Sequence, residues 1–148
     1  MVDYETIDII SLLICSFCIL IVYIFSLALI FQKANEKPYK ALVPIYNIYT
    51  LSKISKSTKA FEIGLKSSFI LLAINGLIQI EAVTNETYIT VLTIIEYILL
   101  TLILLSRINI CYNITKSFNK RGLFLIGLIL LPHLFIFILS VDKSQYTG

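Results

Sequence analysis

Residues 9–32 form a run without a charged side chain, in which Ile, Leu, Val and Phe dominate. A helix needs about 20 apolar residues to cross the hydrocarbon core of a bilayer, so this run is long enough to span it. The composition of the whole chain agrees, because 58% of its residues are hydrophobic and only 14% are charged, against about 25% charged in soluble domains. The sequence therefore predicts an integral membrane protein.

Three further apolar runs predict a fold of the all-α class, an integral membrane bundle of four transmembrane helices in a single domain. The predicted spans cover residues 9–32, 63–80, 87–106 and 122–141, and the predicted cytoplasmic loops cover residues 33–62 and 107–121. The second span is short unless the side chain of Lys66 extends its ammonium to the interface. Pro132, near the middle of the fourth span, should kink or loosen that helix.

Lysine and arginine are concentrated in the two predicted loops and at their edges. These cationic residues are Lys33, Lys37, Lys40, Lys53, Lys56, Lys59, Lys66, Arg107, Lys116, Lys120 and Arg121, which leaves only Lys143. The other side of the bundle receives Asp3, Glu5, Asp8, Glu81, Glu86 and Asp142. Because cationic loops are retained in the cytoplasm, we expect a multi-pass protein of the cell membrane with both termini outside.

The first predicted loop is long and carries Tyr39, Tyr46 and Tyr49 between lysines. Aromatic rings and cationic side chains anchor at the headgroup level of a bilayer, so this loop suits an interfacial position. Its apolar residues recur at every third position, which does not give a clean amphipathic face. A loop packed under the bundle therefore stays open as the alternative to a membrane-binding segment.

The same loop reads Lys33-Ala-Asn-Glu-Lys-Pro-Tyr-Lys-Ala-Leu-Val-Pro-Ile-Tyr-Asn47, and the stretch from Phe118 to Pro132 closes on Gly-Leu-Ile-Leu-Leu-Pro. Both stretches resemble a family of small prokaryotic membrane proteins classed only as a domain of unknown function, whose loop reads K-A-G, an aromatic residue and A-x-x-P-x-Y-N. The residues on that pattern are Lys33, Ala34, Tyr39, Ala41, Pro44, Tyr46 and Asn47. The resemblance implies a multi-span membrane protein, here taken as bacterial, and brings no catalytic assignment.

Four residues depart from the family pattern. Asn35 and Asn119 stand where glycine is usual, and Tyr39 stands where tryptophan is usual. Asn can adopt the left-handed backbone conformation of glycine, so we expect the turns at Asn35 and Asn119 to be kept. His133 is particular to this sequence.

Glu96 and His133 are ionisable residues inside predicted spans, where a charged side chain costs about 2.5–3.5 kcal/mol. Counted from the outer face at about 1.5 Å per residue, the two lie at nearly the same depth, so helix packing would bring them together as an intramembrane polar pair. Such a pair either relays a proton or forms one hydrogen bond between two helices, worth about 0.6 kcal/mol. We favour the hydrogen bond.

The cations that follow the third span suggest a contact with lipid. Arg107, Lys116, Lys120 and Arg121 are suited to anionic lipid headgroups, although ordinary retention of positive charge on the inner side also explains them. The sequence contains no catalytic or cofactor-binding motif, and its single histidine cannot build a multi-histidine metal site. We therefore expect no enzyme activity, no cofactor, no metal and no nucleic-acid partner.

Two classes of function remain. The first is an accessory or protective protein, for example one that confers immunity to a membrane-active peptide, acting through helix or lipid contacts with the bilayer, a membrane-protein partner or a second copy of the chain. The alternative is a small transport subunit or oligomeric pore that uses Glu96 and His133, because intramembrane ionisable residues commonly line pathways. A membrane enzyme that lacks its soluble partner is a third option.

Overall fold

The computed structural model of the protein describes residues 4–79, 86–120 and 122–147. Every element of secondary structure in these residues is a helix. The elements are α1 (Tyr4–Lys33), the 3-10 helix η1 (Pro38–Leu42), α2 (Pro44–Ile54), α3 (Thr58–Gln79), α4 (Glu86–Ser117), α5 (Gly122–Leu130) and α6 (Pro132–Val141). The predicted all-α class is therefore confirmed for the described part of the chain.

Three stretches of helix are long and apolar enough to cross a membrane. They are Ile9–Lys33 of α1, Thr58–Ile78 of α3 and Tyr88–Ser117 of α4. Each covers most or all of one of the first three predicted spans, which makes the fold compatible with a membrane-embedded protein. A bilayer about 30 Å thick also accounts for the exposed apolar side chains along these helices, which water would not tolerate over such areas.

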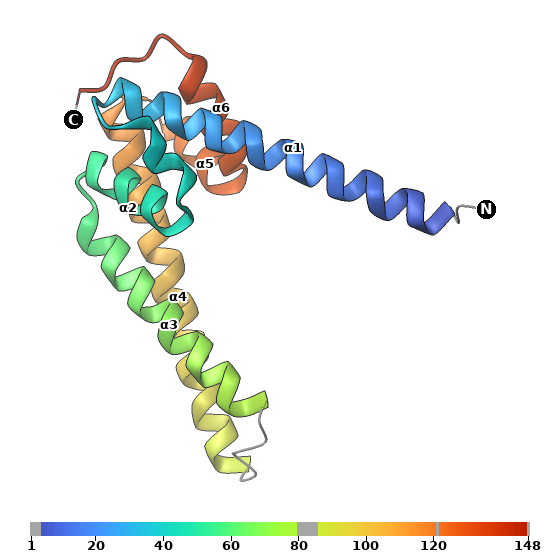
Figure 1. Cartoon of the computed structure of the whole chain (residues 1–148). Coiled ribbons are helices and arrows are strands. Elements are labelled where there is room, and N and C mark those ends of the chain that lie inside the picture. Colours follow the sequence, from blue (N-terminus) through green and yellow to red (C-terminus); the bar gives the residue numbers. More distant parts are fainter. Residues whose placement is uncertain (1–3, 80–85, 121, 148) are drawn as a thin grey trace.

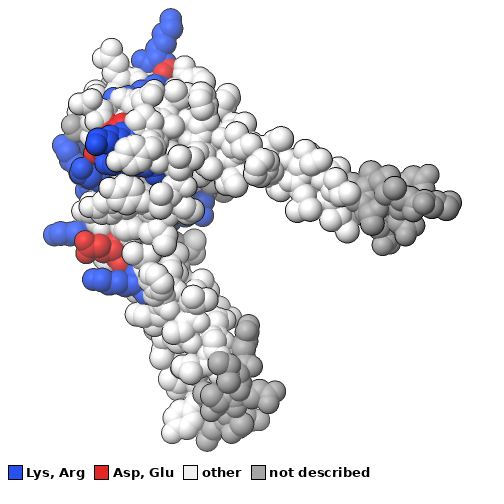
Figure 2. Space-filling model, in the orientation of Figure 1, with Lys and Arg blue, Asp and Glu red and all other residues white. Residues whose placement is uncertain are grey.

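The molecule consists of a compact head from which two arms diverge (Figure 1). The head contains residues 23–33 of α1, η1, α2, residues 107–117 of α4, α5, α6 and the C-terminal segment. The α1 arm consists of residues 9–22, and the α3–α4 arm consists of the paired helices beyond the head. The two arms share a white, uncharged surface in Figure 2, whereas the charged side chains gather on the head and on the adjoining end of α3.

The hydrophobic core lies in the head. Its buried residues are Leu27, Ile30, Phe31, Ala41, Leu51, Ile54, Cys111, Ile114, Phe118, Leu128, Ile136 and Leu139. In the α1 arm, by contrast, every residue from 9 to 22 is exposed. The α3–α4 arm is intermediate, because its two helices pack on each other and bury Ser67, Ile74 and Leu99 between them.

The fourth crossing predicted over residues 122–141 is not confirmed, because the chain folds back within it. Lys120, just before α5, forms an ion pair with Asp142, just after α6, so the two ends of this stretch lie together. The rings of Phe124 and Phe135 have centroids 5.2 Å apart, although they would be about 16 Å apart along one continuous helix. Helices α5 and α6 therefore form a hairpin.

Pro132 and Gly127 explain the hairpin. Pro132 occupies the first position of α6 and Leu131 before it leaves the helical conformation, with φ −130° and ψ 66°. Proline has no N–H for the preceding turn and its ring clashes with the carbonyl four residues earlier, so the helix breaks completely where the sequence predicted a kink. A Cβ atom on Gly127 would lie 2.0 Å from the end of the Phe135 ring, so a larger residue there would require this ring to move.

The hairpin also changes the position of the C-terminus. Thr147 donates a backbone hydrogen bond to the Ser117 carbonyl oxygen at 2.9 Å, and the Tyr146 hydroxyl donates to the Ile54 carbonyl oxygen at 2.8 Å. The C-terminal segment thus lies on the head, beside the Lys33 end of α1, while the N-terminus lies at the far end of that helix (Figure 1). An α1 that crosses the membrane would place Tyr4 and Tyr146 on opposite sides, and the expectation that both termini face outward stays a prediction.

The two predicted loops are largely helical. Helix α4 continues through residues 107–117 of the second loop, and residues 33–62 contain η1, α2 and the start of α3. Three turns connect these helices through residues with positive φ, namely Asn35 at 57°, Lys56 at 55° and Asn119 at 52°. Asparagine therefore does take the left-handed conformation at the two positions where the turns were expected to be kept.

Candidate functional site

A pocket of about 400 Å³ lies where the two arms meet the head. This volume falls within the range of about 300–1,000 Å³ that is usual for ligand sites. The lining is mostly apolar and comes from six helices: Tyr23, Ile48, Leu51, Ala60, Phe61, Gly64, Leu65, Ser68, Ile103, Ser106, Arg107, Ile110, Cys111, Ile114, Leu128, Pro132, His133 and Ile136. Each of the six α-helices of the described residues contributes to it.

Three polar side chains of the lining have no hydrogen-bond partner within the described part of the chain: Tyr23, Arg107 and His133. The rings of Tyr23 and His133 pack with their centroids 4.7 Å apart, and the phenol of Tyr23 lies within electrostatic range of Arg107. The hydroxyls of Ser68 and Ser106, in contrast, donate to carbonyl oxygens of their own helices at 2.8 and 2.7 Å. The pocket therefore combines an apolar lining with three converging groups that can still donate hydrogen bonds.

Local structure explains how these three side chains meet. The break at Pro132 turns α6 so that His133, at its start, faces Tyr23 of α1. Helices α3 and α4 approach closely at Gly64, where an added Cβ atom would lie only 3.2 Å from the Cβ atom of Ser106. Arg107 is the next residue of α4 after Ser106. Tyr23 lies one turn before the buried face of α1 begins at Ser26 and Leu27.

The structure does not bring Glu96 and His133 together. Helices α4 and α6 do not pack on each other in the described residues, and Glu96 does not line the pocket to which His133 contributes. Oε1 of Glu96 is buried and has no hydrogen-bond partner among the described residues. The depth comparison that paired the two residues assumed a straight fourth span, and the α5–α6 hairpin removes that assumption.

The predicted cluster of anionic-lipid contacts is divided by the fold. Arg107 lines the pocket, whereas Lys116 is exposed on α4. Lys120 forms an ion pair with Asp142, and its hydrogen bond holds the pKa of that carboxyl below the usual value. Arg121 lies outside the described residues.

The residues of the family-like loop have structural positions in the head. The Lys33 ammonium donates to the carbonyl oxygens of Leu139 at 2.7 Å and Asp142 at 2.5 Å, so it holds the end of α6 against α1. Asn47 is buried and donates to the Ala41 carbonyl oxygen at 3.4 Å, and Pro44 begins α2. Tyr39 and Tyr46 are exposed, while Ala34 packs against the core.

A second surface of interest is formed by α2, whose outer face is apolar. The side chains of Ile45 and Ile48 are 57% and 46% exposed, whereas Thr50 and Ser52 are 1% and 0% exposed. Both buried hydroxyls donate to carbonyl oxygens within α2, at 2.8 and 2.7 Å. The buried face of α2 also supplies Leu51 and Ile54 to the core, so the helix is apolar on both faces, and its apolar outer face, unlike that of a helix on the surface of a soluble protein, favours contact with lipid.

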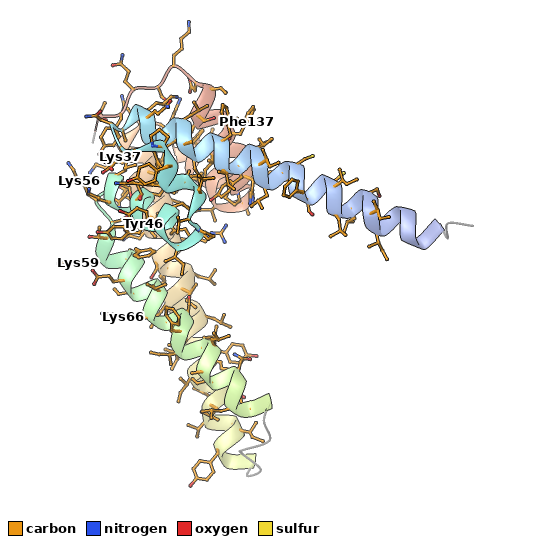
Figure 3. All side chains as sticks on the ribbon, in the orientation of Figure 1. Lys37, Tyr46, Lys56, Lys59, Lys66 and Phe137 are labelled. Atoms are coloured by element: carbon orange, nitrogen blue, oxygen red, sulfur yellow. The ribbon has the colours of Figure 1, made fainter. Side chains whose placement is uncertain are left out.

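Lysines surround this surface. Figure 3 shows Lys56, Lys59 and Lys66 along one side of the molecule, from the turn before α3 into that helix, and all three are exposed. Lys40 and Lys53 instead bind Glu36 at 2.6 and 2.9 Å and hold the pKa of its carboxyl below the usual value. The turn before α3 and the start of that helix thus present unpaired positive charge next to the exposed aromatic and aliphatic side chains of the head.

The fold and this site define a helical protein that is compatible with insertion into a membrane and carries a cationic end. The model of a family of unknown function, DUF5684, matches residues 39–148, so the chain belongs to that family. The match includes the pocket residues of α2 to α6 and leaves out Tyr23, Lys33 and Ala34. No curated protein and no solved structure matches the chain.

Sequence reasoning missed Tyr23 and the role of Asp142. Tyr23 lies inside a uniform apolar run, where a tyrosine has no distinguishing neighbour, and only the return of α6 gives it a partner. Asp142 was assigned to the outer side because it follows an apolar run of about the length of a span. Its neighbour Lys120 is 22 residues away, and no spacing rule pairs them.

Proposed function

We propose that the protein is a non-enzymatic accessory protein of a bacterial cell membrane that acts through contacts of its head with anionic lipid. In this proposal the head faces the cytoplasm, the N-terminus faces outward, and protection against a cationic membrane-active peptide is the concrete role. The observation that supports it is the apolar outer face of α2, with Ile45 and Ile48 exposed beside exposed lysines.

The physical basis is the charge of the inner leaflet. Each lysine near an anionic bilayer surface contributes about 1 kcal/mol of attraction, and aromatic side chains such as Tyr46 favour the headgroup level. The Lys40 ammonium also lies over the ring of Tyr46 at 5.7 Å from the centroid. The head would therefore collect anionic lipids around it, the same lipids that attract a cationic peptide.

The test compares cells that express the full chain, the triple variant Lys56→Gln/Lys59→Gln/Lys66→Gln, or no chain, after exposure to a cationic membrane-active peptide. We expect the natural chain to raise the peptide concentration that kills, and the triple variant to lose most of that protection. Glu62→Gln is the matched control, because it lies between the same lysines and changes the charge in the opposite direction. Equal survival of cells with and without the chain would overturn the proposal.

The orientation has its own test. In a chain whose three cysteines are replaced by serine, a single cysteine at position 143 should react with a membrane-impermeant reagent only after the cells are opened. Labelling in intact cells would place the head outside.

The transport alternative is not proposed for a single chain. It depended on Glu96 and His133 acting together, and these residues belong to helices that do not pack on each other in the described residues. A proton leak through liposomes that is lost in both Glu96→Gln and His133→Phe would reinstate it.

A further inference from the structure

We propose that the pocket between the arms binds one anionic phospholipid, with an acyl chain among its apolar side chains and the phosphate against Arg107, Tyr23 and His133. This inference deepens the proposed function, since it assumes that the chain acts through lipid, but it concerns a single bound molecule and a different set of residues. It follows from the lining of the pocket, from the polar groups at its edge and from the elements that form it.

The lining suits an acyl chain. Leu65, Ile103, Ile110, Leu128 and Ile136 face the same space from four helices. While the pocket is empty, the apolar side chains that line it lack dispersion contacts on the side of the open space. An apolar chain restores those contacts without leaving a polar group unsatisfied.

The edge of the pocket suits a phosphate. The guanidinium of Arg107 can bind two phosphate oxygens at once through parallel N–H groups. In the described part of the chain no carboxylate forms an ion pair with Arg107, whereas the carboxylates of Glu36 and Asp142 are already paired with lysines elsewhere in the head. The hydroxyl of Tyr23 and a ring N–H of His133 add two further donors.

The position of the pocket indicates that the ligand comes from the bilayer. Tyr23, Ser68 and Ile103 belong to the three stretches of helix that are long and apolar enough to cross a membrane. A molecule that reaches the pocket along these helices arrives from lipid, with its charged end at the level of Arg107. A fatty acid shares this chemistry, with a carboxylate in place of the phosphate, and the experiment below separates the two.

The test uses the full chain reconstituted in phosphatidylcholine bilayers that contain a trace of phosphatidylglycerol with a photoreactive group on one acyl chain. After illumination, the labelled positions are mapped by mass spectrometry of peptides. We expect labels on the pocket residues of α3 and α6, and a loss of labelling by about tenfold or more in Arg107→Gln, the size expected for a hydrogen bond to a charged group. His133→Phe keeps the ring contact with Tyr23 and removes the donor, so it should lose several-fold.

Two controls keep the result interpretable. Lys116→Gln removes an exposed cation from the same helix outside the pocket and should leave labelling unchanged. Unlabelled phosphatidylglycerol should compete with the probe, and competition by fatty acid alone would overturn the assignment to a phospholipid. Labels spread evenly along residues 9–22, or equal labelling of Arg107→Gln and the natural chain, would overturn the site.

This outcome is separable from that of the proposed function. If the pocket residues are not labelled but cells are still protected, only the proposal of a bound phospholipid fails. If the pocket residues are labelled but the chain gives cells no protection, the proposed protective role fails and the lipid site stands.

Discussion

Residues 9–22 and 23–33 belong to one unbroken helix and are both rich in Ile, Leu and Phe, yet their surroundings differ. The first half is exposed on every side, whereas the second half supplies Leu27, Ile30 and Phe31 to the centre of the core. Hydropathy does not predict this difference, because the exposed first half is the more apolar one, whereas the second half includes Tyr23, Ser26, Gln32 and Lys33. The difference comes from the elements that fold back onto the second half, namely η1 and α6.

The comparison shows what holds such a fold together. Inside a bilayer the lipid is as apolar as leucine, so helices associate through close packing and hydrogen bonds. The second half of α1 has both, because Ser26 is fully buried at the contact and Lys33 binds the carbonyl oxygens at the end of α6. Every residue of the first half is exposed, and this half remains a single helix.

The sharpest test of this difference is a matched pair of leucine substitutions in α1. Leu27→Ala should lower the free energy of unfolding by about 2–5 kcal/mol, because it leaves a cavity in a packed core. Leu20→Ala should change it by less than about 0.5 kcal/mol, since that side chain contacts lipid in both states. Reversible unfolding in mixed micelles measures both, and similar losses for the two variants would mean that the α1 arm is packed against something in the folded protein.

The polar contact at the end of α1 should have the next largest effect. Lys33→Met keeps the apolar stem and removes two charge-assisted hydrogen bonds to carbonyl oxygens, so we expect a loss of about 2 kcal/mol in the free energy of unfolding. Lys37→Met is the control, because Lys37 is exposed and takes no part in the ion pairs of the head. If the two variants are equally stable, Lys33 does not hold the α5–α6 hairpin in place.

Much of the fold could be predicted from the sequence, because apolar runs fix the existence of α1, α3 and α4 and charge clustering fixes which of their ends share a side. The hairpin could not be predicted in this way. A stretch of 20 apolar residues looks the same whether it crosses a bilayer or turns back at Pro132, and the turn depends on the Gly127–Phe135 contact, which appears only when the chain has already folded.

The candidate site was predictable only in part. His133 was recognised because ionisable residues are rare in apolar segments, and Arg107 because it is one of the cations that follow the third predicted span. The described structure does not bring His133 and Glu96 together, because depth was counted along a helix that does not continue. Tyr23, the actual neighbour of His133, is 110 residues away along the chain and gives no signal of its own.

The smallest predicted effect concerns the turn between α2 and α3 and has the opposite sign. Lys56 adopts φ 55°, a conformation that costs an L-residue about 1–2 kcal/mol, and its backbone geometry is that of a helix-ending turn in which glycine is preferred. Asn35 and Asn119 occupy the equivalent turns after α1 and α4, and asparagine bears that conformation more easily. Lys56→Gly should therefore raise the free energy of unfolding by about 0.5–1 kcal/mol, once the greater freedom of glycine in the unfolded chain is subtracted.

Lys56→Ala removes the same ammonium but keeps Cβ, so it should leave stability nearly unchanged. If both substitutions stabilise the protein equally, then repulsion among the lysines limits the stability of this turn. The backbone conformation of Lys56 would not then be the cause.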